Sequence, residues 1–497
     1  MNKRLLDACE LEPLHLSGAI LAHGTLLVVD QNGKISHVAA NIADFLGSPP
    51  ESWLGQYLPA ELAGPLQALA LKSGSRLVVE GAILASTQIG KGQLDLVASR
   101  NQEKSVTLEL SASQAEGFHS GFDAGCPPLL TSFSNSPTDA LAIAAAQDEL
   151  LQCIMKLTGF QRVMLYSFRE DGDGQVIAES RQGEVYGSYL GLRFPAADIP
   201  HIARALYLKN PWRLIPDAAQ DPVPLLSRDG MAPDLTYSDL RSVSEVHRVY
   251  LANMGVSASL SFPVVSGGAL IALVACHHKS PRQPPLQSLI RASRLTVDFG
   301  LAMSASQAHN RIRLIDGLAH RFDSARFLLH RHGDLISAWP ELGELLMHVF
   351  GADGATLCQD DACVSLGKSF EPAALSAFDE WFCHEQKEFI WFGDSLTRLV
   401  KNYPLSEVAG ASALRIKARN GRELRVYLTR LEHIHEVAWG GNPDKPFEFH
   451  DGALGIAPRR SFEKWVEQRF GYSRAWDNEA RLLAFKLREL LMNQASL

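Results

Sequence analysis

The segment 193–200, which reads Arg-Phe-Pro-Ala-Ala-Asp-Ile-Pro, constrains the backbone more than any other part of this chain. Each proline fixes its own φ angle and biases the residue before it toward an extended conformation. Asp198 is therefore held between two restricted positions, and the basic residues Arg204 and Arg213 follow it. Fixing a carboxylate in so restricted a segment costs conformational entropy, and such a carboxylate usually binds another group. The simpler alternative is a tight turn that precedes a helix.

The chain has 497 residues, a length that predicts about three domains. Apolar residues make up 46% of the chain and charged residues 21%, so each domain can bury a normal core. The formal net charge of −8 argues against a general nucleic-acid-binding surface. No run approaches the ~20 apolar residues that span a membrane, and the charged start lacks the apolar core of a signal peptide. We therefore expect a cytoplasmic protein that binds neither nucleic acid nor membrane.

The seven cysteines are Cys9, Cys126, Cys153, Cys276, Cys358, Cys363 and Cys383. Their number is odd and none forms a C-x-x-C pair, so we expect neither a disulfide framework nor a structural metal site. Most are expected to be small buried hydrophobic residues. Cys9 differs because it lies in a polar N-terminal arm beside Glu10 and Glu12, where the simplest interpretation is an inert exposed thiol.

Short apolar runs separated by turn signals predict a small α/β unit at the start of the chain. Residues 25–29 and 34–38 are predicted strands on either side of the hairpin signal Asn32-Gly33. A helix is expected at 41–46, and further strands are expected near 94–97 and 105–110. The segment 117–137 is rich in Gly, Ser and Pro, which predicts a linker.

The second unit is predicted to open with a helix at 140–158, followed by strands at 162–168 and 174–180. Two apolar runs at 257–265 and 269–277, split by Gly267-Gly268, predict a closing hairpin. This order favours an antiparallel sheet with a pocket on one face. Apolar residues then recur at helical spacing from Leu286 toward Phe322, which predicts a long helix that joins domains and packs on a partner subunit.

A third unit begins near Phe327 and is interrupted by an insertion at about residues 433–472. The chain finishes inside a predicted helix that has no Gly or Pro stop signal, a pattern that would suit the removal of a following output domain. The apolar face of this helix is formed by Leu483, Leu487, Leu490 and Leu491.

The N-terminal arm resembles the signature of bacterial phytochromes, a cysteine in a C-E-x-E-P-I-H context followed by P-G-x-I-Q-P-H-G. The matching residues are Cys9, Glu10, Glu12, Pro13, His15, Gly18, Ile20, His23 and Gly24, whereas Ser17, Leu21 and Ala22 depart from the signature. The resemblance implies that Cys9 adds to the A-ring vinyl group of a biliverdin cofactor. Such an addition needs the thiol to be held near the alkene, so proximity in a pocket would have to drive it.

The second unit resembles the phytochrome GAF domain almost continuously from Gly159 to His278, and the segment 195–200 resembles its PASDIP motif. The resemblance implies that Asp198 offers its backbone carbonyl to the pyrrole N–H groups, with Ile199 beside it and Ala197 in place of the usual serine. His247 matches a histidine near the pyrrole nitrogens, although Glu245 replaces a proline there, and His277 matches one that reaches the D-ring carbonyl. A lone histidine is more often a surface or core residue, but both keep the family context, and histidine can follow a change in chromophore charge near neutral pH.

The resemblance also implies a lining for the pocket. Arg213 and Arg241 match the propionate-binding arginines of the family, and the guanidinium fork suits bidentate contacts with a carboxylate. Ser259 and Ser261, on one strand face, would serve the other propionate. The aromatic residues that match the bilin lining are Tyr166, Phe194, Tyr207 and Tyr250. By composition alone these four would be assigned to the core.

The insertion in the third unit resembles the tongue of the phytochrome PHY domain, with its W-G-G and P-R-x-S-F motifs. The matching residues are Trp439, Pro458, Arg459, Ser461 and Phe462. The resemblance implies an ion pair between Arg459 and Asp198 that seals the pocket, whereas the alternative is a solvated basic loop. Gly and Pro favour a hairpin here, yet Phe462, Trp465, Val466 and Phe470 lie at helical spacing, so we expect an element with two conformations.

We therefore predict an α+β fold with antiparallel sheets: an N-terminal arm (1–12), a PAS domain (13–120), a GAF domain (138–305), a connecting helix (306–326) and a PHY domain (327–497). Because the arm of this family threads through a GAF loop, a knotted PAS–GAF junction is implied. The expected function is red/far-red light reception by C15=C16 isomerisation of covalently bound biliverdin, with tongue refolding. The alternative is a PAS/GAF sensor of a small ligand such as a cyclic nucleotide or haem, which gives no reason for Cys9 or Arg459.

The sequence contains no kinase nucleotide-binding boxes, no Gly-rich phosphate loop and no phospho-acceptor helix, so this chain is not expected to be an enzyme. The family often carries a histidine kinase beyond this point, acting on a response regulator, and these are the implied partners together with a second copy of the chain.

Overall fold

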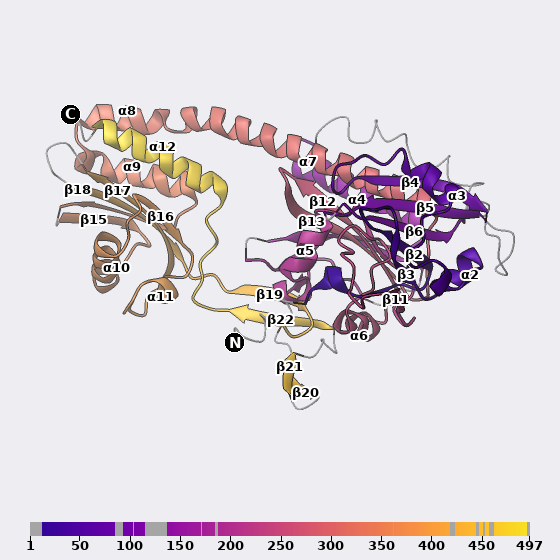
Figure 1. Cartoon of the computed structure of the whole chain (residues 1–497). Helices are drawn as coiled ribbons and strands as arrows, with labels where there is room; N and C mark the ends of the chain where they lie inside the picture. The colour runs from indigo at the N-terminus through magenta and orange to yellow at the C-terminus, as the bar shows by residue number, and fades with distance from the viewer. Residues whose placement is uncertain are drawn as a thin grey trace. The chain divides into compact units, whose positions relative to one another are not determined.

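The computed structural model describes residues 12–84, 93–102, 104–114, 137–169, 171–183, 187–360, 362–417, 423–443, 447–450, 453–456 and 462–494. The chain divides into two compact units (Figure 1). The first comprises Met1–Ser306 and Ala438–Trp465, and the second comprises Gln307–Val437 and Val466–Leu497.

The first unit contains a seven-stranded sheet in the order β1-β11-β3-β2-β6-β5-β4. Its strands are β1 (Ala19–Ile20), β2 (Gly24–Val29), β3 (Ile35–Ala39), β4 (Arg76–Leu84), β5 (Gln93–Arg100), β6 (Val106–Ala112) and β11 (Val223–Ser227). The accompanying helices are η1 (Leu14–Leu16), α2 (Ile42–Leu46), η2 (Pro50–Ser52) and α3 (Ala60–Leu66). The predicted β2–β3 hairpin is confirmed, with Gly33 at a φ of 79° in its turn.

Strand β11 comes from a much later part of the chain than its neighbours in this sheet. It pairs antiparallel with β3 through Leu225 and Ala39, and with β1 through Val223 and Ile20. Residues after the linker thus complete the sheet of the first predicted domain. The knot stays a prediction from the resemblance.

An eight-stranded sheet has the order β10-β12-β13-β7-β8-β9-β19-β22. Its strands are β7 (Arg162–Phe168), β8 (Gly174–Arg181), β9 (Arg193–Phe194), β10 (Arg213–Ile215), β12 (Ala258–Ser266), β13 (Ala269–His278), β19 (His435–Gly440) and β22 (Lys464–Arg469). The helices near it are α4 (Ala140–Thr158), η3 (Ala196–Asp198), α5 (His201–Tyr207), α6 (Glu245–Asn253) and the long α7 (Leu286–Arg321).

The two faces of this sheet have different roles because side chains alternate along each strand. On β13, Val274 and Cys276 join the core formed with α4 and the start of α7. Leu273, Ala275 and His277 point to the opposite face, where they line a pocket. The predicted helix at 140–158 is confirmed: Asp139 caps it by accepting from the Ala142 N–H at 2.9 Å.

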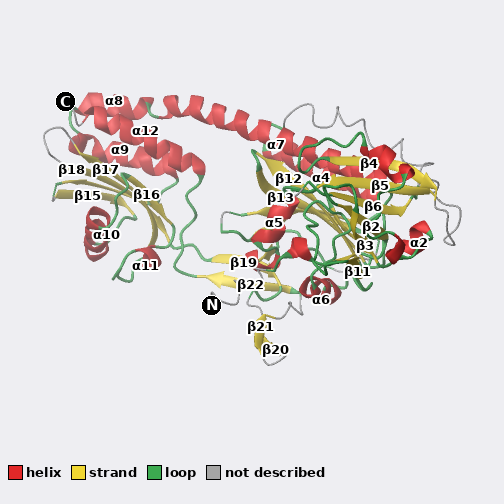
Figure 2. Ribbon diagram, viewed as in Figure 1, coloured by secondary structure: helices red, strands yellow, loops and turns green. Residues whose placement is uncertain are grey.

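The second unit is built on a five-stranded antiparallel sheet in the order β15-β14-β18-β17-β16. Its strands are β14 (Gly354–Gln359), β15 (Ala362–Gly367), β16 (Ile390–Gly393), β17 (Val408–Lys417) and β18 (Glu423–Leu431). Helices α8 (Asp323–His332), α9 (Leu335–Phe350) and α12 (Asn478–Gln494) cover one face. Helices α10 (Pro372–His384) and α11 (Leu396–Leu399) cover the other (Figure 2). A separate hairpin consists of β20 (Phe447–His450) and β21 (Ala453–Ile456).

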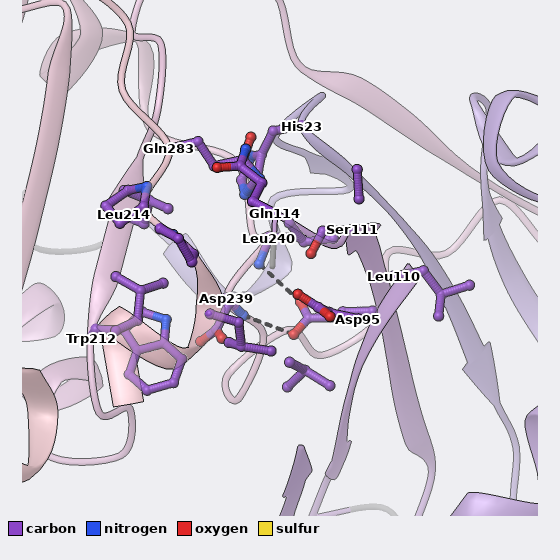
Figure 3. A pocket seen from close by; sticks show the side chains of 17 residues that line it. His23, Asp95, Leu110, Ser111, Gln114, Trp212, Leu214, Asp239, Leu240 and Gln283 are labelled. Carbon is purple, nitrogen blue, oxygen red and sulfur yellow. Dashed lines mark hydrogen bonds between the residues drawn. The ribbon is translucent and has the colours of Figure 1, made fainter. Parts of the chain in front are cut away.

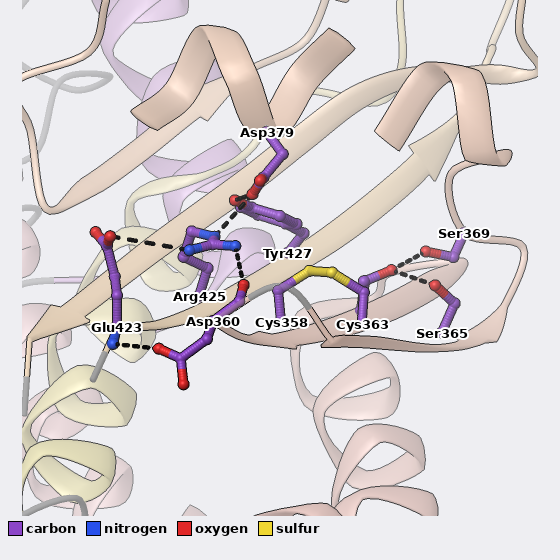
Figure 4. Close-up of a disulfide and its surroundings, with 10 residues drawn as sticks. Cys358, Asp360, Cys363, Ser365, Ser369, Asp379, Glu423, Arg425 and Tyr427 are labelled. Carbon is purple, nitrogen blue, oxygen red and sulfur yellow. Dashed lines mark hydrogen bonds and ion pairs between the residues drawn. A yellow bond between two sulfur atoms is a disulfide. The ribbon is translucent and has the colours of Figure 1, made fainter. Parts of the chain in front are cut away.

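The described residues contain one disulfide, which the cysteine spacing did not predict. Cys358 and Cys363 are joined, with Cα atoms 4.1 Å apart (Figure 4). The reason is register, since the β14–β15 hairpin places these two residues directly opposite each other. Cys153 and Cys276 are buried, as expected. The α+β class, with a separate sheet for each of three domains, is confirmed.

Candidate functional site

A cavity of about 250 Å³ lies on the face of the eight-stranded sheet that α4 leaves open. Strands β7, β12 and β13 form its floor, and α5, α6 and the segment 197–200 form its walls. All the pocket residues expected between positions 166 and 277 line it: Tyr166, Phe194, Asp198, Ile199, Tyr207, Arg213, Arg241, His247, Tyr250, Ser259, Ser261 and His277. Residues scattered over more than a hundred positions therefore meet in one place.

The two prolines around Asp198 shape a short 3₁₀ turn that leads into α5. Pro195 starts the turn, and Pro200 precedes the first residue of α5. Arg204 braces it by donating to the carbonyls of Ile199 (2.7 Å) and Gly172 (2.7 Å), so its guanidinium supports the loop and is not part of the pocket lining. The Asp198 carboxylate accepts from the Tyr250 hydroxyl at 3.2 Å.

His247 and His277 both face the pocket. His247 lies in the first turn of α6, which Ser244 caps, and its ring stacks on Tyr250 with centroids 5.8 Å apart. Burial, with Arg213 nearby, lowers the pKa of His247 to about 4. Burial, with Arg162 and His247 nearby, lowers the pKa of His277 to about 3. Both rings are therefore neutral at pH 7 in this structure, and each can donate at one nitrogen and accept at the other.

The Nδ1 atom of His277 is buried, and among the described residues it has no hydrogen-bond partner. A buried polar atom without a partner is costly, so a group from outside the chain would be stabilised there.

Arg213 and Arg241 bring two guanidinium groups into the same pocket. Arg213 donates to three backbone carbonyls, those of Asp239 (3.0 Å), Arg241 (2.5 Å) and Ser242 (3.1 Å). Arg241 donates to the carbonyl of Leu235 at 3.3 Å. Within the described parts of the chain, neither arginine forms an ion pair with a carboxylate.

Burial, followed by the neighbouring Arg241, lowers the pKa of Arg213 to about 9, and burial also lowers the pKa of Arg241. Two desolvated cations without carboxylate partners favour an anionic ligand, and guanidinium geometry suits carboxylates. The donor set therefore fits a ligand that carries acidic groups.

Hydroxyl groups complete the polar side of the pocket. Ser259 and Ser261 lie two residues apart on β12 and both line the cavity. The Tyr207 hydroxyl and Ser261 Oγ are 2.9 Å apart. Burial raises the pKa of Tyr207, so it remains a neutral hydroxyl.

Residues of the predicted tongue reach this pocket within the first unit. Trp439 is buried and pairs in register with Arg193 on β9. The Phe462 ring meets Tyr250 edge-on, with centroids 5.0 Å apart. Gly440 lies so close to Phe194 that an added Cβ would come within 2.5 Å of the ring. The tongue thus contacts two aromatic residues of the pocket wall.

Cys9, Pro458, Arg459 and Ser461 lie outside the described residues. The attachment site and the Asp198–Arg459 pair therefore stay predictions. Glu12 and Leu14, the nearest described parts of the arm, do line the pocket.

Sequence reasoning missed Tyr189, which lines the cavity, and Arg162, which packs on Tyr189. Tyr189 packs on Phe194 with centroids 5.9 Å apart, and the Arg162 guanidinium lies 4.0 Å from the Tyr189 ring centroid. Both residues belong to apolar or loop segments without a distinctive motif. Glu245, which departs from the family pattern, is exposed and pairs with Arg248 at 3.2 Å in α6.

In the described residues no cluster of His, Cys, Asp and Glu has the arrangement of a metal site. No helix in those same ranges is both long and apolar enough to cross a membrane.

Comparisons with known proteins assign a class to each part of the chain. A PAS fold model matches residues 9–112, a GAF domain model 143–295 and a phytochrome region model 327–496. The chain therefore has the domain class PAS–GAF–PHY.

Two solved structures resemble the whole chain. One is the wild-type photosensory core module of the Stigmatella aurantiaca phytochrome, with a TM-score of 0.81, 30% identity and 98% of each chain covered. The other is a bacteriophytochrome from R. palustris, with a TM-score of 0.80, 28% identity and 98% of this chain covered against 99% of the other.

Among curated relatives, the chain is 32% identical to a bacteriophytochrome of Pseudomonas aeruginosa, over 99% of this chain and 67% of that protein. It is 29% identical to cyanobacterial phytochrome B of Nostoc, over 98% and 66%. The chain belongs to the phytochrome family, and it spans about two thirds of the length of these relatives. Membership of this family implies a bilin chromophore.

Proposed function

We propose that this chain is the photosensory part of a red/far-red light receptor, that it binds biliverdin covalently at Cys9, and that it signals to an output module. The observation that carries the proposal is the pair of guanidinium groups, Arg213 and Arg241, that have no carboxylate partner among the described residues and share a cavity with an unsatisfied histidine nitrogen. Biliverdin has two carboxylates at one side and a carbonyl at the end of its D-ring, which matches that donor set. Once bound, it supplies absorption of red light and isomerisation about C15=C16.

The chain's own residues divide the work of holding such a ligand. Arg213 and Arg241 would bind propionate carboxylates, with Ser259 and Ser261 as hydroxyl donors. His247 and the backbone of Asp198 would face the pyrrole nitrogens, and neutral His277 would donate to the D-ring carbonyl. The aromatic side chains exclude water from the conjugated system.

The length of the intervening chain allows position 9 to reach the pocket. Glu12 lines the cavity, and three residues of extended chain span at most about 11 Å. A thiol in the arm can therefore be brought beside a bound vinyl group, and proximity replaces any need for an unusually reactive cysteine.

The tongue is the proposed switch. Its described residues form strands β19 and β22 and the β20–β21 hairpin, and Trp465, Val466 and Phe470 are 39%, 44% and 58% exposed. These apolar residues share the helical spacing noted in the sequence, so a helix would gather them on one face. The contact from Phe462 to Tyr250, and from Tyr250 to Asp198, links the tongue to the pocket. Light-driven loss of that contact is the proposed trigger for refolding.

Partners are proposed from the long helix. Val297, Leu301 and Ile312 of α7 are 50%, 64% and 59% exposed and lie at helical spacing. Such a stripe suits packing against α7 of a second copy. We propose a homodimer that transmits the signal to a histidine kinase and, through it, to a response regulator.

The test is an absorption spectrum after mixing the protein with biliverdin, recorded before and after red and far-red illumination. The expected result is a reversible red/far-red difference, with pigment that survives denaturation. In Cys9→Ala the pigment should be lost on denaturation, whereas the matched control Cys383→Ala should retain it. Binding without photoreversal would contradict the switch, and no binding would return the chain to the sensors of other small ligands.

A further inference from the structure

The sheet of the PAS region has a polar face that is buried. Along β6, Leu108 and Leu110 belong to the PAS core, and Glu109 points to the opposite face. Glu109 is only 4% exposed. A carboxylate so deeply buried must have partners.

Those partners come from the GAF region, in residues 234–242, which we call the bridging segment. The Leu240 N–H donates to Glu109 Oε1 at 2.9 Å, and the Asp239 N–H donates to Oε2 at 3.2 Å. The Ser238 hydroxyl also donates to Oε1. Figure 3 shows Asp239 and Leu240 at this junction. One carboxylate thus holds three consecutive residues of the bridging segment.

Other PAS side chains hold the same segment. Arg76 of β4 forms an ion pair with Asp239, and its guanidinium lies 4.6 Å from the ring centroid of Trp212. Ser99 of β5 donates to the Tyr237 carbonyl at 3.1 Å. The bridging segment is therefore fixed from the PAS side along most of its length.

The opposite edge of the bridging segment serves the bilin pocket. The Asp239, Arg241 and Ser242 carbonyls accept the hydrogen bonds that orient Arg213. Arg241 belongs to the segment, and its N–H donates to Ser238 Oγ at 3.1 Å. The Asp239 and Leu240 N–H groups face Glu109, and the Asp239, Arg241 and Ser242 carbonyls face Arg213. A displacement of this stretch on the Glu109 side must therefore also move the carbonyls that orient Arg213.

We propose that Glu109 of the PAS sheet is a positioning residue for the two pocket arginines. Its carboxylate fixes residues 238–240, and this stretch sets the places of the Arg213 and Arg241 guanidinium groups. The inference rests on the proposed function, because those arginines are assigned to the propionates of biliverdin.

The charges around Glu109 make this role sensitive to pH. Burial and the nearby Asp239 raise the pKa of Glu109 to about 7, against the opposing effects of its hydrogen bonds and of Arg76. Burial lowers the pKa of His23 to about 4, so that ring stays neutral. A cavity of about 50 Å³ beside Glu109 is lined by His23, Asp95 and Asp239 (Figure 3). The ionisable groups on the surrounding elements are Arg76, Asp95, Asp239, His23, Arg213 and Arg241.

The direction of the pH effect follows from the number of hydrogen bonds that the Glu109 carboxyl group can accept. Above pH 7 the ionised carboxylate accepts from all three donors. Below pH 7 a protonated carboxyl carries a hydrogen of its own and opposes one of the N–H groups. The bridging segment should therefore loosen as the pH falls through about 7.

The first experiment uses the protein before biliverdin is added. Hydrogen exchange at the Asp239 and Leu240 amides is compared between the wild type and Glu109→Gln, which keeps the shape but turns one acceptor into a donor. Exchange should be about tenfold faster in the variant, because a hydrogen bond to a charged acceptor is lost. Glu80→Gln, an exposed position on β4 of the same sheet, is the matched control and should leave both rates unchanged. Equal rates in the wild type and Glu109→Gln would overturn the proposal.

The second experiment measures the bound pigment from pH 5.5 to 8.5. The wild-type spectrum should change with a midpoint near 7, and the wild type at low pH should resemble Glu109→Gln. The variant should lack this transition and bind biliverdin about tenfold more weakly. A variant with the wild-type affinity and pH profile would overturn the proposal.

Failure of the proposed function is distinguishable from failure of this inference. If the wild type does not bind biliverdin, the function fails, and the role of Glu109 toward a bilin fails with it. If Glu109→Gln does not fold, Ser238→Ala removes one donor and leaves the charge. It should accelerate exchange at Leu240 and weaken binding in the same direction, and wild-type behaviour of Ser238→Ala would count against the proposal.

Discussion

At the scale of single residues, the pocket holds histidines whose protonation is opposed and arginines that have lost water without gaining carboxylate partners among the described residues. His247 and His277 are neutral at pH 7 because burial and nearby arginines oppose their protonation. Arg213 and Arg241 are desolvated without carboxylate partners in the described chain. Such a site lowers the stability of the protein when it is empty, and a ligand that brings the missing negative charges is stabilised there.

We predict that the protein without pigment becomes less stable as the pH falls from 6.5 toward 4. His277 has its usual pKa of 6.5 when unfolded and about 3 when folded. Between these values the unfolded chain binds more protons, so stability falls with pH. In His277→Asn the slope of unfolding free energy against pH should drop by about one proton, 2.303RT. Thermal unfolding across this range measures the slope.

The matched control for that experiment is His309→Asn, at an exposed position of α7. It should leave the slope unchanged. A His277→Asn slope equal to that of the wild type would show that the ring is already protonated in the folded protein near pH 6.

At the scale of elements, sequence patterns predicted the helices and strands whose bounds are set by neighbouring residues. Helix α4 has the bounds predicted for it, 140–158, and the structure shows Asp139 capping its start and Gly159 in the left-handed conformation at its end. Strand β4 was missed because its register breaks between Val79 and Ile83, which removes the regular alternation. The disulfide was missed because cysteine spacing does not give hairpin register.

The pocket residues were predicted from family motifs, and periodicity alone would have placed Tyr166 and Phe194 in the core. Glu109 was not predicted, because an alternating polar residue in a strand normally indicates solvent. Only the distant bridging segment buries it. The residue pattern within a strand does not indicate which residues later in the chain will cover one of its faces.

The tongue offers a prediction at this scale. Gly440→Ala should displace the tongue from β9, because the added Cβ would meet the buried Phe194 ring. Overpacking of this kind costs about 1–3 kcal/mol, so protease cleavage after Trp439 should become at least about fivefold faster. Gly64→Ala, in α3 with open space around it, is the control. Equal cleavage of Gly440→Ala and the wild type would mean that Phe194 moves aside without loss.

At the scale of the whole molecule, the PAS and GAF regions are structurally interdependent. Strand β11 separates β1 from β3 in the PAS sheet. A small core beside it joins Ile20, Leu26, Val28 and Ala39 to Leu235 and Leu240. Removing the later residues would expose both an edge and an apolar surface.

We predict that a fragment of residues 13–120 does not fold as a stable monomer, whereas residues 12–306 do. Size-exclusion chromatography and circular dichroism would compare the two. The shorter fragment should elute as aggregates or as an expanded chain, because β3 lacks one of its two partners, β11, and the shared core is incomplete. A compact monomer with native-like strand content would contradict this prediction.

The position of β11 also has a consequence for synthesis. Residues 35–39 leave the ribosome well before residues 223–227, yet β3 pairs with β11 in the finished sheet. The sheet of the first domain therefore keeps an open edge until residues 223–227, within the second domain, have been synthesised. Recombination that exchanged one domain between relatives would separate strands that complete each other, so the two regions are expected to be inherited as one unit.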